Sequence, residues 1–267
     1  MTDLQQLLDG EGARGRLDRA ALDLATIHFP GLDPNPFLAQ LNEMAASLAD
    51  RMRNFNDGRD FVETAQRYLF GELGFRGNES DFFDPRNSCL NQVLERRTGI
   101  PITLAVVYME IARRLQMPVY GIGLPRHFVL EFNDGNYQTY IDPFHGGRPV
   151  TAQECFALAG AEVADPALLR RVNNKQIVVR MLQNLHRAYL RQRDFQRAVG
   201  TLDFMIHAAP EIGPWYKHRG ALLLQLRRLQ AARRDLEKYL ELEPEAPDRA
   251  EIVKQIEAVH RWLGQVN

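Results

Sequence analysis

The sequence predicts an α+β protein, with a core of helix and antiparallel sheet, a helical cover before it and an all-helical array after it. Three observations support this fold class. Apolar residues recur at helical spacing within residues 16–73, a helix and a β-hairpin are expected within residues 99–142, and a 34-residue spacing recurs after residue 177. We expect a first domain at residues 1–172 and a second at residues 173–267, because the character of the chain changes there.

Three amphipathic helices are expected in the N-terminal part. They cover residues 16–28, a segment that starts at Asp33-Pro34-Asn35-Pro36, and residues 60–73. Each carries apolar residues on one face, so the three helices should pack as a cover on the core.

The core should begin with a helix at Pro101, because proline is tolerated where the first N–H of a helix has no partner. Its apolar positions predict one buried face, while Glu110, Arg113 and Arg114 should reach water. Strands are expected at residues 119–124, 126–132 and 137–142. The turn residues Asn133-Asp134-Gly135-Asn136 join the last two strands into a hairpin.

The hairpin is expected to bring His127 and Asp142 together. A four-residue loop pairs Phe132 with Tyr137 and therefore places His127 opposite Asp142. Side chains in that relation have Cβ atoms roughly 4.5–5.5 Å apart, so the carboxylate would fix the tautomer of the imidazole. The other face is apolar, which favours this register: Phe128, Leu130, Phe132, Tyr137 and Ile141. The alternative is a structural pair without catalysis.

A Gly-Ile-Pro turn, a helix, a His-bearing strand and an Ile-Asp-Pro-Phe segment resemble the papain-like transglutaminase core. In that fold a Cys at the start of the helix attacks, a His activates it and an Asp orients the His. The resemblance implies the last two roles for His127 and Asp142. It places Pro101 at the nucleophile position, and neither Cys of the chain is there.

The closer resemblance is to the bacterial SirB-type family, a transglutaminase-like domain with a tetratricopeptide tail, and it covers nearly the whole chain. The matching motifs are Asn87-Ser88-Cys89-Leu90-Asn91, Gly99-Ile100-Pro101-Ile102, Leu124-Pro125 with His127-Phe128, Ile141-Asp142-Pro143-Phe144, and Arg180-Met181-Leu182 with Asn184-Leu185. The sequence departs from the family at Arg126, where members carry a glycine-like residue. Members commonly lack the nucleophilic Cys, so the resemblance does not imply turnover.

Two further residues are candidates for the same cleft. Cys89 precedes a helix expected at Leu90–Arg97, with Ser88 or Asn87 as its cap, and a helix dipole lowers the pKa of a thiol at that end. Cys89 is therefore a candidate nucleophile, and the alternative is a small buried residue. His145 follows Asp142 in a glycine-rich loop and either lines the cleft or faces solvent.

The C-terminal part predicts two tetratricopeptide repeats and a capping helix at residues 248–263. Pro210 and Pro244 are 34 residues apart, and other residues fall into the same register: Tyr189 with Leu223, Ala198 with Ala232, and Leu202 with Leu236. Gly220 occupies the small position where two helices cross.

The start of this array is basic. Residues 170–197 contain eight Lys or Arg and the single acid Asp194. Arg180, Gln183, Arg187 and Lys217 are candidate partner-binding residues of the repeat groove, and an acidic peptide or carboxylate is the expected guest. The alternative is a solvated face.

Composition excludes several classes of protein. With 45% hydrophobic residues, a net charge of −1 and two Cys without CxxC spacing, the 267 residues predict a cytoplasmic protein without a signal peptide or membrane span. Metal-ligand and nucleotide motifs are missing, so we expect no cofactor, no metal and no nucleic-acid partner. The predicted function is a non-catalytic interaction or regulatory module with a protein or peptide partner. The alternative is a thiol-type acyl transferase or amide hydrolase that uses Cys89 with His127 and Asp142.

Overall fold

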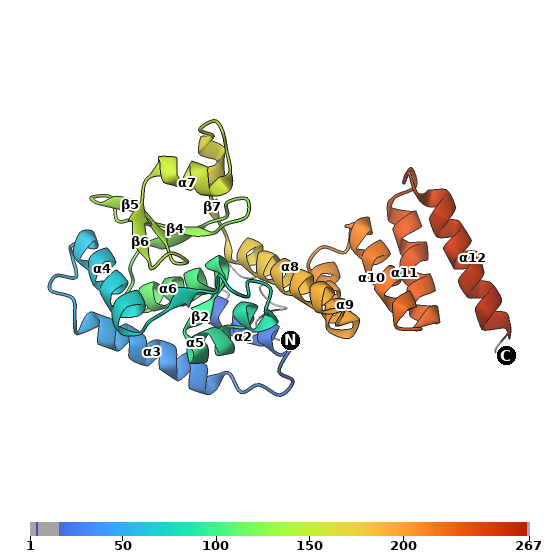
Figure 1. The fold of residues 1–267 in the computed structure, drawn as a ribbon, viewed down its shortest axis with the longest axis horizontal. Coiled ribbons are helices and arrows are strands. Elements are labelled where there is room, and N and C mark those ends of the chain that lie inside the picture. The colour runs from blue at the N-terminus through green and yellow to red at the C-terminus, as the bar shows by residue number, and fades with distance from the viewer. Residues whose placement is uncertain (1–3, 5–15, 266–267) are drawn as a thin grey trace. The chain divides into compact units, whose positions relative to one another are not determined.

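The computed structural model describes Leu4 and residues 16–265 (Figure 1). Apart from Leu4, the N-terminal residues that led us to expect no signal peptide lie outside this part. The chain divides into two compact units, Met1–Met181 and Leu182–Asn267, so that the division falls within helix α8. The predicted domain boundary near residue 172 falls at the end of strand β7 and stays a prediction.

The first unit contains the predicted helices and antiparallel sheet. Its helices are α2 (Leu17–Ala25), α3 (Asn35–Ala49), α4 (Gly58–Ala65), α5 (Leu90–Arg96), α6 (Pro101–Arg114) and α7 (Ala152–Ala159). A π-helical segment at Gln66–Glu72 continues α4, and 3-10 turns occupy Pro85–Ser88 and Pro166–Leu169.

Among the residues that the structure describes, seven short strands complete the first unit. Strands β1 (Arg76–Gly77) and β2 (Thr98–Gly99) form a parallel pair. Strands β3 (Val119–Ile122), β4 (Val129–Asn133), β5 (Gln138–Asp142), β6 (Arg148–Val150) and β7 (Arg171–Val172) form an antiparallel sheet in the order β6-β5-β4-β3-β7.

Helix α6 is the centre of the first unit. It begins at Pro101, as predicted, and it contacts β3 and β4 on one side and α3 and α5 on the other (Figure 1). Its buried Tyr108 packs edge-on against Phe61, which in turn contacts Phe132 of the sheet. The expectation that Glu110 reaches water is wrong, because its carboxylate is buried and pairs with Arg113 and Arg114.

The hairpin forms, but the predicted register is wrong. The turn lies one residue later in the chain than predicted, so the cross-strand partner of each residue shifts by two positions. Asn133 pairs with Gln138, and Phe132 pairs with Thr139 instead of Tyr137. The reason lies in the loop, where the Asp134 carboxylate accepts hydrogen bonds from the backbone N–H groups of residues 136 and 137 and so includes Tyr137 in the turn. His127 consequently lies before the first residue of β4 and has no cross-strand partner in the hairpin.

The second unit is helical, as predicted. It contains the end of α8 (Asn174–Gln192), then α9 (Phe195–Ala208), α10 (Gly213–Gln225), α11 (Leu229–Leu242) and α12 (Arg249–Gln265). The predicted close crossing at Gly220 is confirmed, since a Cβ there would lie 3.0 Å from Leu236 Cδ2. Among the described residues, no helix is both long and apolar enough to cross a bilayer.

Candidate functional site

His127 lies in the turn between β3 and β4. Its backbone N–H donates to the carbonyl of Leu124 at 3.3 Å. The preceding residue, Arg126, has a φ of 61°, in the left-handed region that glycine adopts most readily. Backbone geometry therefore accounts for the glycine-like residue expected at this position, and Arg126 adopts the same geometry with an exposed side chain.

Asp142 connects two imidazoles. His127 Nε2 lies 3.0 Å from Asp142 Oδ1, and His145 Nδ1 lies 2.7 Å from Asp142 Oδ2. The backbone N–H groups of Phe144 and His145 also donate to Oδ1, at 3.0 and 3.3 Å. The two imidazole rings stack nearly parallel, with centroids 5.6 Å apart. The structure thus brings His127, Asp142 and the minor candidate His145 into one cluster at the end of β5.

The carboxyl group of Asp142 is ionised in this cluster. Burial by itself would raise its pKa, but the hydrogen bonds and positive charge of His127 and His145 outweigh burial and hold the pKa at about 2. Burial also raises the pKa of the Cys155 thiol, to about 11, and the negative charge of Asp142 adds to this increase.

The turn that carries His127 is held by an arginine from α8. Arg180 Nη2 donates to the carbonyl oxygens of Leu124 and His127, at 2.6 and 2.7 Å. Arg180 was expected in the repeat groove; it belongs to the first unit, and its guanidinium contacts the turn between β3 and β4 of that unit. The two carbonyls that accept from Arg180 are 56 and 53 residues away in the sequence, so the spacing of residues along the chain did not reveal them.

The position that should present the nucleophile offers no reactive group. Pro101 is the first residue of α6 and is buried. Thr103, the nearest hydroxyl in the sequence, is fully buried, and its Oγ1 donates to the carbonyls of Asn87 and Ile100. The hydroxyl is therefore engaged with the backbone.

Cys89 is also turned to the backbone. It is fully buried, and its Sγ lies 3.4 Å from the carbonyl oxygen of Pro85. It is itself the N-cap of α5, so the expectation that Asn87 or Ser88 caps this helix is wrong.

A cleft of about 690 Å³ adjoins the cluster. It is lined by Arg76, Gly77, Asn78, Glu79, Ser80, Arg96, Thr98 and Phe144. The Phe144 ring stands edge-on to both imidazoles, with centroids 6.0 Å from His127 and 5.1 Å from His145. Phe144 therefore forms a wall shared by the cleft and the cluster. Sequence reasoning missed this cleft, because its residues come from three separate segments.

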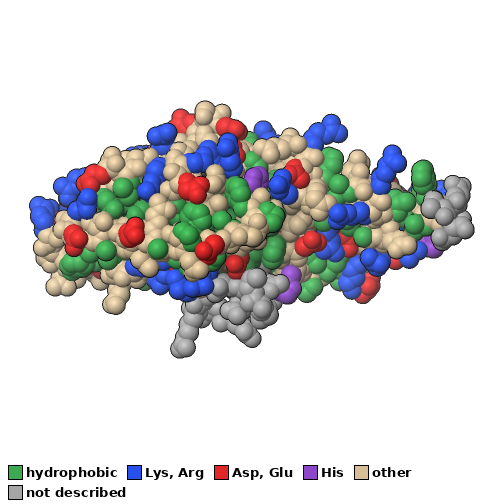
Figure 2. Space-filling model, turned by 90° about the horizontal axis from the view of Figure 1, so that it is seen from below, with side chains coloured by type: hydrophobic (Ala, Val, Ile, Leu, Met, Phe, Trp, Pro, Cys, Tyr) green, Lys and Arg blue, Asp and Glu red, His purple; other side chains and the backbone are tan. Residues whose placement is uncertain are grey.

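The expected partner-binding residues of the second unit have different surroundings. Lys217 Nζ pairs with the carboxylate of Asp248 at 2.9 Å and lies over the ring of Tyr239. Gln183 is half-buried and Arg187 is exposed. In the face shown by Figure 2, basic and acidic side chains are interspersed, consistent with a net charge of −1.

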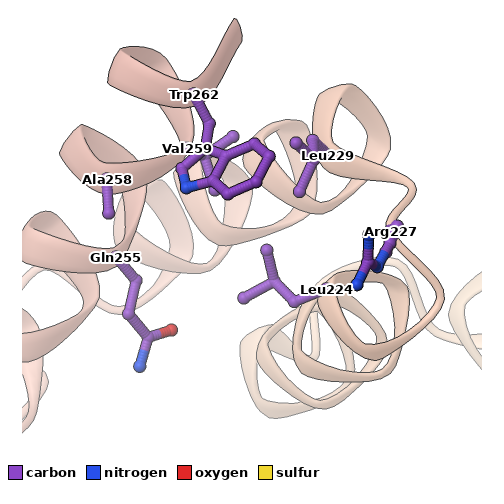
Figure 3. Close-up of a pocket in the computed structure, with 7 residues that line it drawn as sticks. All are labelled: Leu224, Arg227, Leu229, Gln255, Ala258, Val259 and Trp262. Carbon is purple, nitrogen blue, oxygen red and sulfur yellow. The ribbon is translucent and has the colours of Figure 1, made fainter.

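The second unit also contains an apolar pocket of about 360 Å³ (Figure 3). Its walls come from α10, α11, α12 and the turn between α10 and α11: Leu224, Arg227, Leu229, Gln255, Ala258, Val259 and Trp262. Trp262 and Val259 face Leu224 and Leu229 across it. None of the four expected partner-binding residues lines this pocket.

A buried histidine of the second unit was not predicted. His186 Nδ1 lies 2.8 Å from Thr201 Oγ1, and its Nε2 has no hydrogen-bond partner among the described residues. The ring of His218 stands perpendicular to it, with centroids 4.8 Å apart. Burial and the positive charge of His218 lower the pKa of His186 to about 4, so this imidazole is neutral at physiological pH.

Known proteins resemble both parts of the chain. Residues 35–183 match the transglutaminase-like superfamily model, and residues 185–257 match a tetratricopeptide repeat model. The UPF0162 protein of Xylella fastidiosa strain 9a5c is 36% identical over 232 residues, 84% of this chain and 83% of that protein. Human F-box only protein 21 is 38% identical over 125 residues, 44% of this chain and 20% of that protein. The solved structure of menin aligns with a TM-score of 0.46 and 12% identity, over 96% of this chain and 74% of menin.

Proposed function

Because the chain belongs to the transglutaminase-like superfamily, as a SirB-type (UPF0162) member, we propose that it is a non-catalytic module that binds protein segments. One observation carries this proposal: α6 starts with Pro101, which has neither a nucleophilic group nor a proton to surrender. The neighbouring Thr103 hydroxyl and Cys89 thiol are buried and turned to backbone carbonyls. A base without a nucleophile within reach has nothing to activate.

The cleft beside Phe144 is the proposed binding site. It has room for several side chains, and Arg76 and Arg96 contribute positive charge to its lining. Arg96 lies 3.5 Å from the Asp84 carboxylate, whereas Arg76 is exposed. Arginine forms strong charge-assisted hydrogen bonds with carboxylates, so a segment that carries Asp or Glu fits this chemistry. The tetratricopeptide repeats supply a second protein-binding surface, where exposed Arg187 remains the best basic candidate.

The lack of turnover is tested with purified protein. Wild type and Cys89→Ser are incubated with amine donors, glutamine-containing peptides and a thiol-directed activity probe. We expect no product and no probe labelling in the folded state, because Cys89 is fully buried and Cys155 has a raised pKa. Turnover or labelling that disappears in Cys89→Ser would overturn the proposal.

That result would favour the second candidate function, thiol-dependent acyl transfer or amide hydrolysis. The specific observation in its favour is the 3.0 Å hydrogen bond between His127 and Asp142, which orients an imidazole as a catalytic base requires. Cys89 would then have to leave its contact with Pro85 and reach the imidazole.

Binding is tested with fluorescent peptides, an acidic set against a charge-reversed set. We expect the acidic peptides to bind, with an affinity that falls as salt rises. Arg76→Ala should weaken binding, whereas Arg170→Ala, a matched exposed arginine outside the cleft lining, should not. Equal binding of both peptide sets, or equal loss in both variants, would contradict the proposed site.

A further inference from the structure

We propose that His127, Asp142 and His145 form a binding site for a divalent transition-metal ion of the zinc, cobalt or nickel class. The inference does not depend on the proposed protein-binding function. It concerns a second imidazole, that of His145, which a catalytic His–Asp pair does not need.

The ligand set is suited to such an ion. Two imidazoles and one carboxylate are ligands that zinc and its neighbours in the transition series accept. One ligand atom from each of the three residues lies within 4.8 Å of the other two. Both carboxylate oxygens of Asp142 face ring nitrogens, Oδ1 that of His127 and Oδ2 that of His145.

The distances require only a small adjustment. At metal–ligand bonds near 2.1 Å, neighbouring ligand atoms lie about 3.0–3.4 Å apart in octahedral or tetrahedral geometry. The two nitrogen–oxygen distances are 3.0 and 2.7 Å, so each must lengthen by a few tenths of an ångström. The two imidazoles must also approach a common point, and His145 can supply this movement. Its side chain is 43% exposed, and the two glycines that follow it both have positive φ.

Hydrogen bonds from neighbouring groups hold the other two proposed ligands, Asp142 and His127, in place. Asp142 Oδ1 accepts hydrogen bonds from two backbone N–H groups of its own loop, which hold this oxygen in place. Arg180 holds the His127 carbonyl and therefore the turn from which the imidazole projects. Such outer contacts orient metal ligands and raise metal affinity. Three protein ligands leave at least one position for water or for a carboxylate from a bound partner.

The test uses the full chain, without a histidine tag and stripped of metal by a chelator. Cobalt is titrated and followed by its visible d–d absorption, and zinc affinity is measured in competition with a chromophoric chelator. We expect one equivalent to bind, with at least a tenfold weaker affinity in His145→Gln, since even outer-shell changes cost about 10–100-fold. His260→Gln removes an exposed histidine of α12 and should leave the affinity unchanged.

Two results would overturn the site. One is the absence of any binding at metal concentrations up to the millimolar range. The other is an equal affinity in wild type and His145→Gln. If His145→Gln fails to fold by circular dichroism, zinc-induced NMR shifts in the wild-type imidazoles replace it. Shifts confined to His127 and His145 support the site, and shifts elsewhere refute it.

Discussion

Replacing Arg180 with alanine should loosen the turn that carries His127. The guanidinium donates to two carbonyls of that turn, at 2.6 and 2.7 Å. A hydrogen bond to a charged group contributes about 1.5–3 kcal/mol. Because Arg180 is half-buried and water can replace part of the interaction, the lower value applies, and two bonds give about 3 kcal/mol of local stability.

The assay must be local, because a chain of two units does not unfold in a single two-state step. Backbone hydrogen exchange in residues 119–133 reports the opening of this turn and its strands. A loss of about 3 kcal/mol corresponds to roughly a hundredfold faster exchange through local opening. Arg187→Ala is the matched control, since it changes an exposed arginine of the same helix and should alter stability by less than about 0.5 kcal/mol.

Arg180→Lys should give an intermediate result, because an ammonium group cannot reproduce the planar geometry of the guanidinium. If the backbone amides of residues 119–133 exchange equally fast in Arg180→Ala and Arg187→Ala, the anchoring role of Arg180 is refuted. If Arg180→Ala and Arg187→Ala then also lost peptide affinity equally, Arg180 would be a partner-binding residue, as its position in the sequence predicts.

Three further predictions concern titration and packing. Asp142 has a folded pKa of about 2 against an ordinary 3.8, so it contributes about 2 kcal/mol of stability above pH 4. That stability is lost as the pH falls through the folded pKa. The unfolding free energies of wild type and Asp142→Asn, measured at a series of pH values, should therefore become more alike as the pH falls from 4 toward 2. His186 has a folded pKa of about 4 against 6.5, so the second unit should lose about 3 kcal/mol between pH 7 and pH 4. Urea unfolding followed by tryptophan fluorescence checks this, because both tryptophans lie in that unit, and an unchanged dependence in His186→Gln would refute it. Gly146 and Gly147 have φ of 77° and 64°, so alanine at either costs about 1–2 kcal/mol. Only at Gly147 does the new Cβ collide with the Phe70 ring, so Gly147→Ala should lower the melting temperature further than Gly146→Ala.

Some errors of the sequence interpretation have a local cause that only the structure displays. The hairpin register was wrong because Asp134 captures the backbone N–H of Tyr137 and moves the turn by one residue. The predicted apolar face is nevertheless correct, and Leu130 pairs with Ile141 on it. Moving the turn by one residue shifts each cross-strand partner by two positions, and a shift of two positions leaves the same side chains on the same face. Apolar alternation therefore determines the faces of a hairpin more firmly than its register.

Buried charge is a second example. Glu110 was expected in water because charged residues on a helix usually face solvent. Its carboxylate is instead buried beside Arg113 and Arg114, and Arg114 also binds Asp18 of α2 at 2.7 Å. The partner from α2 is 96 residues away in the sequence, so spacing along one helix could not reveal it.

The sequence by itself determined the fold class, the start of α6 at Pro101 and the repeated helices of the second unit. These features depend on local chemistry: a proline without an N–H, apolar residues at helical spacing, and small residues repeated after 34 positions. Only the tertiary structure decided what surrounds His127. The anchoring Arg180 lies 53 residues away in the sequence, the loop after β5 adds His145 to the cluster, and burial turns Cys89 toward a backbone carbonyl. Such contacts join segments distant in the sequence, and a pattern within one segment carries no information about which distant group will meet it.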